Sequence, residues 1–299
     1  MTTRSRTRVA AALTAGLLAL PLHSASATPP PRFSTIKLST GIQLHYAEQG
    51  RTNGEPVILL HGYSDSWFSY SRILPHLPDD LRVFALDLRG HGQSDRPASG
   101  YGMNDLAADV LAFMDAKGIV RATIVGHSMG GFVAQQVALA APKRVSRLVI
   151  VSSARTPRAF AGIEEFKPVV DALQDPVPYE FVQEFQLSTV HQSVPDAFMD
   201  NVIAESLRLP SRVWRGIMDG MLAMEPAVAL GRAGIPSLVI WGEQDAWPPR
   251  AEQDSLVAML RTARLEVLRN IGHAPHWERP DEFAWVLREF IGRTRPAGE

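Results

Sequence analysis

The stretch TIVGHSMGGFVAQQVALA, residues 123–140, decides the fold. A run of apolar residues stops at Gly126, a serine follows, and apolar residues then return at helical spacing. Ser128 stands at the centre of a G-x-S-x-G pattern between these two halves. Gly126 and Gly130 have no Cβ, so a strand and a helix can approach closely around a sharp turn at the serine. The stretch therefore predicts a strand, a tight turn that exposes Ser128, and a helix.

The rest of the chain alternates short aliphatic runs with helix-like segments. A helical pattern between two of the aliphatic runs has Asn104 as its predicted N-cap and Gly118 as its stop. Several runs are apolar at consecutive positions, which is typical of strands buried on both faces of a parallel sheet. The predicted strands are STIKLST and IQLHYAEQG, a hairpin around Gly41, followed by PVILLHG, RVFALDL, ATIVG, RLVIVSS, SLVIWG and ARLEVLRN. The fold class is thus α/β, a doubly wound, mostly parallel eight-stranded sheet with an antiparallel hairpin at one edge.

Between Arg155 and Arg232 the rhythm changes to successive amphipathic helices without a convincing strand. The strand pattern returns at Ser237, so residues 155–232 are predicted to be a helical cap inserted between two strands of one sheet. The core then consists of residues 34–154 and 233–299.

The N-terminus has the pattern of an export signal. Arginines at positions 4, 6 and 8 precede a short apolar segment, and Ala27 ends a small-x-small site. No adjacent arginine pair precedes the apolar segment, which favours Sec export over twin-arginine export. The pattern predicts a signal peptide at residues 1–27, cleavage after Ala27, a Pro-rich tail at residues 28–33, and a secreted or periplasmic protein.

Composition narrows the class of partner. The formal net charge is −1 and the chain has no cysteine. This charge balance gives no sign of a basic surface for nucleic acid or of a polybasic segment for an anionic membrane. We therefore expect a small-molecule partner. There is no H-E-x-x-H pattern, no clustered histidine spacing and no phosphate-binding loop, so we expect neither a metal nor a cofactor. The sequence leaves the oligomeric state open.

Several segments after the predicted signal peptide occur in an order that resembles the α/β-hydrolase family. They are LLHGYSDSW, DLRGHGQSDRP, VGHSMGG, IWGEQDAWPP and NIGHAPHWERPDEF. The resemblance is to the serine-nucleophile branch with a helical cap. The chain resembles the esterases of this branch and, in overall pattern only, epoxide hydrolases and haloalkane dehalogenases. Those last two classes attack with an aspartate where this chain has Ser128, so the resemblance implies acyl chemistry.

The resemblance implies a catalytic triad in the order nucleophile, acid, base. Ser128 is the nucleophile and Asp245, after SLVIWG, is the acid, with Glu243 as its rival. His273 in the late loop matches the family's Gly-His pair and is the base, with His276 as its rival. The acid would hold the imidazole in the tautomer that accepts the serine proton.

Two backbone N–H groups would complete the site. The resemblance places the oxyanion donors at Met129, after the nucleophile, and at Tyr63, after His61 and Gly62. His61 itself is expected to be structural. So are Asp87 and His91, which lie in a glycine-rich loop.

Substrate contacts are expected from aromatic and methionine residues. The candidates are three tryptophans, Trp67, Trp214 and Trp247. Trp67 and Trp247 flank the predicted catalytic loops, and Trp214 belongs to the predicted cap. The cap would add an apolar lining from Phe160, Phe166, Phe181, Phe185, Trp214, Met218, Met221 and Met224. At helical spacing, each of these is individually more typical of a core than of a binding site.

Carboxylic-ester hydrolysis is the first functional hypothesis, on small to medium apolar substrates. The HWERPDEF segment with a helical cap also resembles carbon–carbon hydrolases of aromatic degradation, but those carry an HGGGPG-like loop where this chain has HGYSDSW. Lactone hydrolysis, carbon–carbon bond hydrolysis on the same triad and a ligand-binding role without turnover stay open as alternatives.

Overall fold

The computed structural model describes residues 29–294. A single eight-stranded sheet has the order β1-β2-β4-β3-β5-β6-β7-β8, with β1 and β2 antiparallel and all strands from β4 to β8 parallel to one another. The predicted fold class is confirmed. The strands are β1 (Arg32–Lys37), β2 (Gln43–Gly50), β3 (Glu55–Leu60), β4 (Leu81–Leu86), β5 (Ala122–His127), β6 (Val145–Val151), β7 (Ser237–Gly242) and β8 (Ala263–Leu268).

The edge hairpin forms as the sequence predicts. β1 pairs with β2 so that Ile36 lies opposite Leu44. Gly41 takes φ +89° in the connecting turn, a conformation that suits a residue without a side chain. β1 already begins at Arg32, so the predicted Pro-rich tail overlaps its first two residues.

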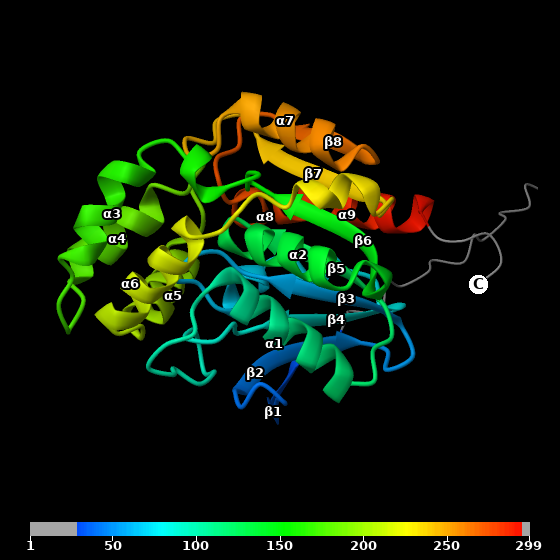
Figure 1. Cartoon of the computed structure of the whole chain (residues 1–299), viewed down its shortest axis with the longest axis horizontal. Coiled ribbons are helices and arrows are strands. Elements are labelled where there is room, and N and C mark those ends of the chain that lie inside the picture. The colour runs from blue at the N-terminus through cyan, green and yellow to red at the C-terminus, as the bar shows by residue number, and fades with distance from the viewer. Residues whose placement is uncertain (1–28, 295–299) are drawn as a thin grey trace, which may run out of the picture.

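Helices cover both faces of the sheet (Figure 1). Alternate residues of β3 divide between the two layers. Ile58 and Leu60 join the apolar cluster under helices α1 (Met103–Ala116) and α2 (Met129–Ala140), while Val57 and Leu59 join the cluster under α9 (Pro280–Arg293). This is why the parallel strands are apolar at consecutive positions. The helices are α1 (Met103–Ala116), α2 (Met129–Ala140), α3 (Ile163–Asp171), α4 (Tyr179–Leu187), α5 (Asp196–Leu207), α6 (Ser211–Leu222), α7 (Arg250–Leu260), α8 (Pro275–Glu278) and α9 (Pro280–Arg293).

Helix α1 begins two residues earlier than predicted. Its N-cap is Gly102, and Asn104 already lies inside the helix. The Asp105 carboxylate accepts a hydrogen bond from the Gly102 N–H at 3.0 Å, which fixes the start of the helix. At the other end, Gly118 takes φ +64° just after the helix, as expected for a stop.

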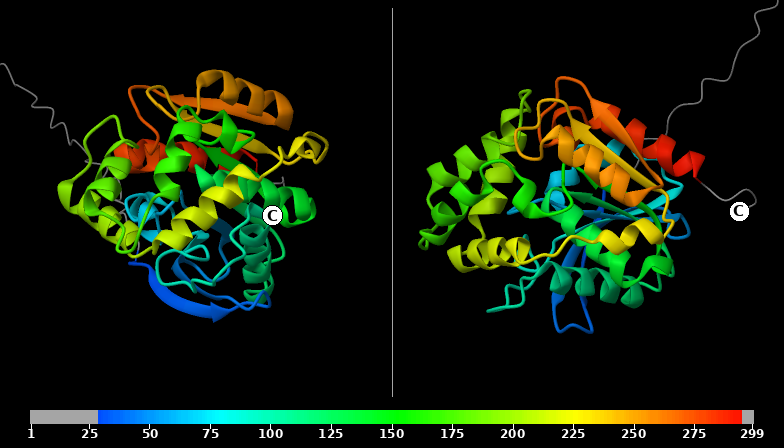
Figure 2. Two further views of the ribbon diagram at one scale, coloured as in Figure 1. Left: turned by 60° about the vertical axis from the view of Figure 1, so that its left-hand side comes forward. Right: turned by 45° about the horizontal axis from the view of Figure 1, so that its top comes forward.

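Four helices, α3 to α6, follow β6 and precede β7. Figures 1 and 2 show them gathered at one end of the sheet, where the parallel strands finish. Helix α6 packs closely on the loop before α1, because a Cβ on Gly220 would lie only 2.1 Å from the Tyr101 carbonyl oxygen. The predicted helical segment at residues 155–232 thus lies over the carboxyl ends of the strands, where ligands bind in open α/β sheets.

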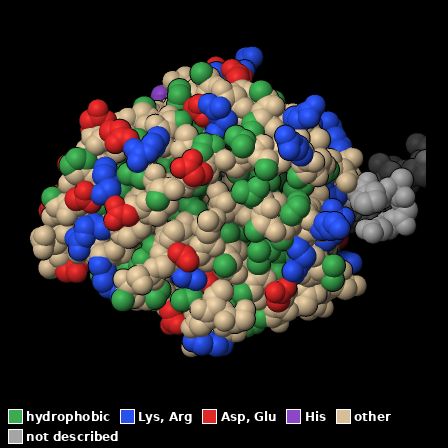
Figure 3. All heavy atoms as spheres, viewed as in Figure 1, with side chains coloured by type: hydrophobic (Ala, Val, Ile, Leu, Met, Phe, Trp, Pro, Cys, Tyr) green, Lys and Arg blue, Asp and Glu red, His purple; other side chains and the backbone are tan. Residues whose placement is uncertain are grey.

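The surface carries mixed charge. On the face drawn in Figure 3, basic and acidic side chains are interspersed over the end that holds α3 to α6, in keeping with the formal net charge of −1. Among the described helices, none is long and apolar enough to cross a membrane. The predicted signal peptide and its cleavage site lie outside the described residues.

Candidate active site

Ser128 sits on a strained turn between β5 and α2. Its backbone has φ 50° and ψ −115°, which a residue with a side chain rarely adopts. Its N–H donates to the Val151 carbonyl at 2.9 Å, which fixes the turn against the neighbouring strand. The turn needs its glycines: a Cβ on Gly126 would lie 2.1 Å from the Gly130 carbonyl oxygen, and one on Gly130 would lie 2.1 Å from the Leu60 carbonyl oxygen.

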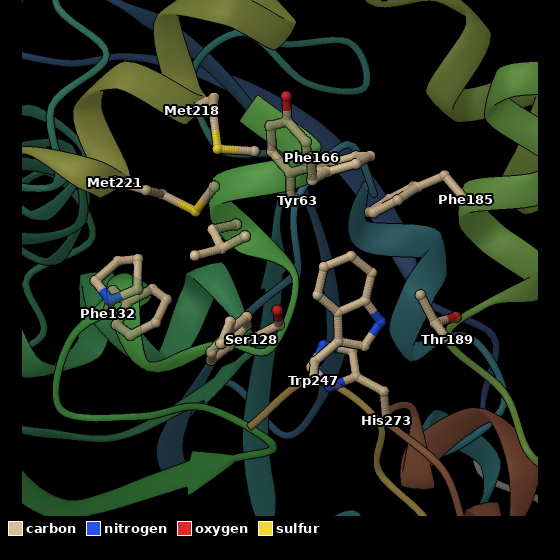
Figure 4. Close-up of a pocket in the computed structure, with 13 residues that line it drawn as sticks. Tyr63, Ser128, Phe132, Phe166, Phe185, Thr189, Met218, Met221, Trp247 and His273 are labelled. Atoms are coloured by element: carbon tan, nitrogen blue, oxygen red, sulfur yellow. The ribbon is translucent and has the colours of Figure 1, made fainter. Parts of the chain in front are cut away.

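Asp245 and His273 are paired in the loops after β7 and β8. The His273 Nδ1–H lies 3.0 Å from both carboxylate oxygens of Asp245. One of those oxygens also accepts the Trp247 N–H at 3.0 Å, which orients the carboxylate. With Nδ1 as the donor, Nε2 is left to accept a proton. Figure 4 shows His273 and Ser128 facing the same cavity.

The Tyr63 N–H belongs to a peptide group whose orientation is fixed. The Gly62 carbonyl on the same peptide accepts from His61 Nδ1 at 2.8 Å and from the Asp65 N–H at 3.3 Å. Because a trans peptide points its N–H away from its C=O, both bonds orient the Tyr63 donor. His61 Nε2 accepts the Leu88 N–H at 3.1 Å, and burial lowers the His61 pKa to about 4. His61 is therefore a neutral structural residue, as predicted.

The Met129 N–H is the first of the unpaired donors at the start of α2. Within residues 29–294, neither this N–H nor that of Tyr63 has a hydrogen-bond acceptor. The Tyr63 side chain is held separately, because its hydroxyl donates to the Trp214 carbonyl at 2.7 Å. Both backbone donors are thus available to an incoming oxyanion.

The cavity at Ser128 has an empty volume of about 400 Å³, which includes its opening to solvent. Apolar side chains dominate its wall, and Figure 4 shows the two methionines of α6 and the phenylalanines of α3 and α4 around the serine. The lining is Tyr63, Ser128, Phe132, Pro157, Phe160, Ile163, Phe166, Phe185, Thr189, Met218, Met221, Trp247 and His273.

Of the three predicted tryptophan contacts, only Trp247 lines the cavity. Trp214 is fully buried behind Tyr63, with the two rings 5.0 Å apart, so it supports the wall without reaching the cavity. Trp67 lies elsewhere: its N–H donates to Asp87 at 2.7 Å and its ring packs on Phe33 at 4.6 Å. The interpretation of Trp67 and Trp214 as lining residues is wrong for this cavity.

The rival residues have other partners. His276 is fully buried, its Nε2 lies 3.0 Å from the Ser69 hydroxyl, and burial followed by the nearby His273 lowers its pKa to about 3. Its ring packs on Phe283 of α9. Glu243 accepts the Asn270 N–H at 3.2 Å. Neither lines the cavity.

Asp87 and His91 are scaffolding, as predicted. Asp87 is fully buried and accepts bonds from His45 Nδ1 at 2.7 Å and from the Gln93 N–H at 2.9 Å. The His91 Nδ1 lies 3.0 Å from the Arg89 carbonyl. These bonds hold the loop after β4 and do not reach Ser128.

The sequence model of the alpha/beta hydrolase fold matches residues 55–280, most of the chain. The chain belongs to the α/β-hydrolase family. The match begins with β3 and ends at the start of α9, so it spans Ser128, Asp245 and His273. The resemblance that the ordered segments gave is therefore confirmed.

Two curated relatives of this α/β hydrolase are at least 30% identical. One, from Cupriavidus necator, is the dihydrolipoyllysine-residue acetyltransferase component of an acetoin cleaving system, 32% identical over 84% of this chain and 67% of its own. The other is a 2-hydroxy-6-oxononadienedioate/2-hydroxy-6-oxononatrienedioate hydrolase from Paraburkholderia xenovorans, 30% identical over 87% of this chain and 94% of its own. An esterase from Rhodococcus sp. ECU1013 has the same fold, with a TM-score of 0.78, 24% identity, and coverage of 88% and 99%.

Sequence reasoning missed part of this α/β hydrolase's cavity. The lining includes four residues that the sequence analysis does not predict: Phe132, Pro157, Ile163 and Thr189. Phe132 follows the Gly130-Gly131 pair within the nucleophile stretch, and its position on the first turn of α2 is a signal that could have indicated it. Thr189 has no such signal, because it follows α4 in a loop whose path depends on tertiary packing.

Proposed function

We propose that this α/β hydrolase is a serine esterase that cleaves carboxylic esters of small to medium apolar compounds. The observation that carries the proposal is that Ser128 and the Asp245-paired His273 meet in one apolar cavity. A serine hydroxyl is a weak nucleophile until a base takes its proton, and His273 is the base at hand.

The reaction follows from these groups. Ser128 Oγ attacks the ester carbonyl carbon while His273 Nε2 takes the hydroxyl proton, and the Tyr63 and Met129 N–H groups hold the oxyanion. The tetrahedral intermediate collapses, the alcohol leaves with the proton from His273, and an acyl-enzyme is left on Ser128. A water molecule, deprotonated by His273, then attacks the acyl carbon and releases the acid. Asp245 stabilises the imidazolium in both halves.

The lining favours a neutral substrate. It contains no lysine or arginine among its described residues. A carboxylate bound there would be desolvated without a cationic partner, which is strongly unfavourable. The Paraburkholderia relative is named for a dicarboxylate substrate. Its 30% identity still makes carbon–carbon bond hydrolysis the second candidate on the same triad.

A substrate panel on the purified protein tests the proposal. Short p-nitrophenyl esters, lactones and vinylogous diketones are assayed side by side, with Ser128→Ala as the control. We expect ester turnover that the Ser128→Ala variant loses by at least about 1,000-fold. Turnover of diketones alone would replace the proposal with the carbon–carbon hydrolase. If the protein binds a ligand but turns over no ester, and Ser128 does not react with a fluorophosphonate probe, the protein is a ligand-binding protein without turnover.

We also propose that the chain is exported by a Sec-type signal. The support is the sequence of residues 1–27, with basic residues, a short apolar segment and a small-x-small site at Ala27. Expression of the full chain in a bacterial host, followed by N-terminal sequencing of the protein from each fraction, tests this. The mature protein should begin at Thr28 and appear outside the cytoplasm. An uncleaved chain in the cytoplasm would contradict export.

A further inference from the structure

A buried polar cluster joins helix α4 to the loop that carries the Tyr63 donor. Gln186 is fully buried, and its Nε2 lies 2.8 Å from the Ser206 hydroxyl and 3.2 Å from both the Ser64 hydroxyl and an Asp65 carboxyl oxygen. The Ser206 hydroxyl also lies 3.0 Å from the Ser64 carbonyl, to which it can donate. Helices α4 and α5 are thus bonded directly to the two residues that follow Tyr63.

Packing alone does not explain a polar side chain at the position of Gln186. The Gln186 Oε1 is buried without a hydrogen-bond partner in the described residues. A buried, unpaired polar atom costs stability that an apolar side chain of similar volume would not. Gln186 does not line the cavity, although its neighbours Phe185 and Thr189 do. Its amide therefore contacts the loop and not the substrate.

The chain just after Gln186 holds the other catalytic loop. The Thr189 carbonyl accepts the Ala274 N–H at 3.1 Å, next to His273. The Glu278 carboxylate accepts the N–H of Gly272 at 2.9 Å and that of Gln192 at 2.6 Å. The two segments pack closely here, because a Cβ on Gly272 would lie 2.6 Å from the His191 backbone nitrogen.

We propose that residues 186–192 act as a strut that fixes the oxyanion-donor loop relative to the base loop, with Gln186 as the positioning residue at its oxyanion end. The proposal rests on the esterase function proposed above. It assigns to the end of α4 a role in transition-state geometry, in addition to any contact of α4 with substrate.

The expected effect is on turnover and not on ground-state binding. A lost oxyanion donor lowers kcat by about 100- to 1,000-fold, and a displaced donor loses part of that. Replacing Gln186 by methionine keeps its length but removes its donors. We expect kcat to fall by about 10- to 100-fold and KM to stay within about twofold, because the oxyanion forms only in the transition state.

Gln183→Met is the matched control. Gln183 lies on the same helix, and among the described residues its side chain bonds only to Tyr179 of that helix, at 3.3 Å. Its substitution should leave kcat and KM unchanged. A phenylboronic acid, which forms a tetrahedral adduct on the serine, gives a second readout: its inhibition constant should rise in Gln186→Met in parallel with the loss in kcat/KM. Thermal unfolding of both variants checks that they fold.

The outcomes are separable. If Gln186→Met retains wild-type kcat, or if only KM rises, the strut is overturned. If that variant does not fold, Ser206→Ala takes its place, since it removes the hydroxyl that bonds both Gln186 and Ser64. If the wild-type protein hydrolyses no ester, the proposed function fails. The rate of Ser128 labelling by a fluorophosphonate then decides the strut: slower labelling of Gln186→Met supports it, and equal labelling overturns it.

Discussion

His127 Nε2 lies 2.9 Å from the backbone carbonyl oxygen of His273. A carbonyl can only accept, so Nε2 carries the hydrogen and donates. The residue before the nucleophile is therefore bonded directly to the residue that carries the base. Burial, followed by the nearby His276 and His273 side chains, holds the His127 pKa well below its usual value, so His127 stays neutral and keeps this tautomer.

Replacing His127 by phenylalanine should cost both stability and turnover. It removes the donor and leaves the buried His273 carbonyl unpaired, which lowers the free energy of unfolding by about 1–3 kcal/mol. The base loop also loses an anchor, so kcat falls. His127→Gln, whose amide N–H can reach the same carbonyl, should recover part of both. Urea unfolding and steady-state kinetics measure the two effects, and equal losses in the two variants would contradict this role.

The glycines of the nucleophile turn should not tolerate even one methyl group. Gly130→Ala places its Cβ 2.1 Å from the Leu60 carbonyl oxygen, which is backbone of the central sheet. We expect the free energy of unfolding to fall by about 3 kcal/mol or more. Gly292→Ala is the matched control: no atom lies within 4 Å of its added Cβ, and in helix α9 alanine should be neutral or stabilise by up to about 1 kcal/mol. Comparable losses in the two variants would refute the steric explanation.

The sequence alone predicts those features of the site that depend on local sequence patterns. G-x-S-x-G between a strand and a helix predicted the turn at Ser128. The family resemblance, with its order of nucleophile, acid and base, implied the pairing of Asp245 with His273, whose 3.0 Å contacts the structure shows. The catalytic roles of these residues stay predictions until the variants are assayed.

What the sequence could not predict is the direction of side chains in tertiary packing. Trp214 and Trp247 look equivalent as aromatic residues near the site, yet one ring fills the space behind Tyr63 and the other lines the cavity. The start of α1 is a similar case. Asn104 and Gly102 both suit an N-cap, and the Asp105 carboxylate bonded to the Gly102 N–H decides between them.

Acid should destabilise the fold through its buried histidines. Burial lowers the pKa of His61 to about 4 and that of His276 to about 3, and it holds those of His91 and His127 well below the usual value. Unfolded, each titrates near pH 6.5, so unfolding takes up protons below that pH. The free energy of unfolding should therefore fall as the pH drops from 6.5 towards about 4.

Asp65 opposes this trend. Burial raises its pKa from 3.8 to about 7, so the folded protein keeps a proton that the unfolded chain releases. Its contribution to stability is present below pH 3.8 and is lost as the pH rises to about 7. Asp65→Asn removes that opposing contribution, so its free energy of unfolding should rise more steeply between pH 5 and pH 7 than that of the wild type. Urea unfolding at several pH values measures both slopes, and parallel profiles would exclude this role for Asp65.

Chain-length preference should depend on Met221. Its side chain lines the cavity wall from α6, so Met221→Ala lengthens the space that an acyl or alcohol group can fill. We expect kcat/KM for a longer p-nitrophenyl ester to rise relative to the acetate by about 10-fold, because one methylene group in an apolar pocket is worth about 1–3 kcal/mol. Met224→Ala is the control, since Met224 is also buried and does not line the cavity. It should leave the ratio of the two kcat/KM values unchanged. A similar shift in both variants would mean that general loosening of the helices sets the preference, and that the Met221 contact does not.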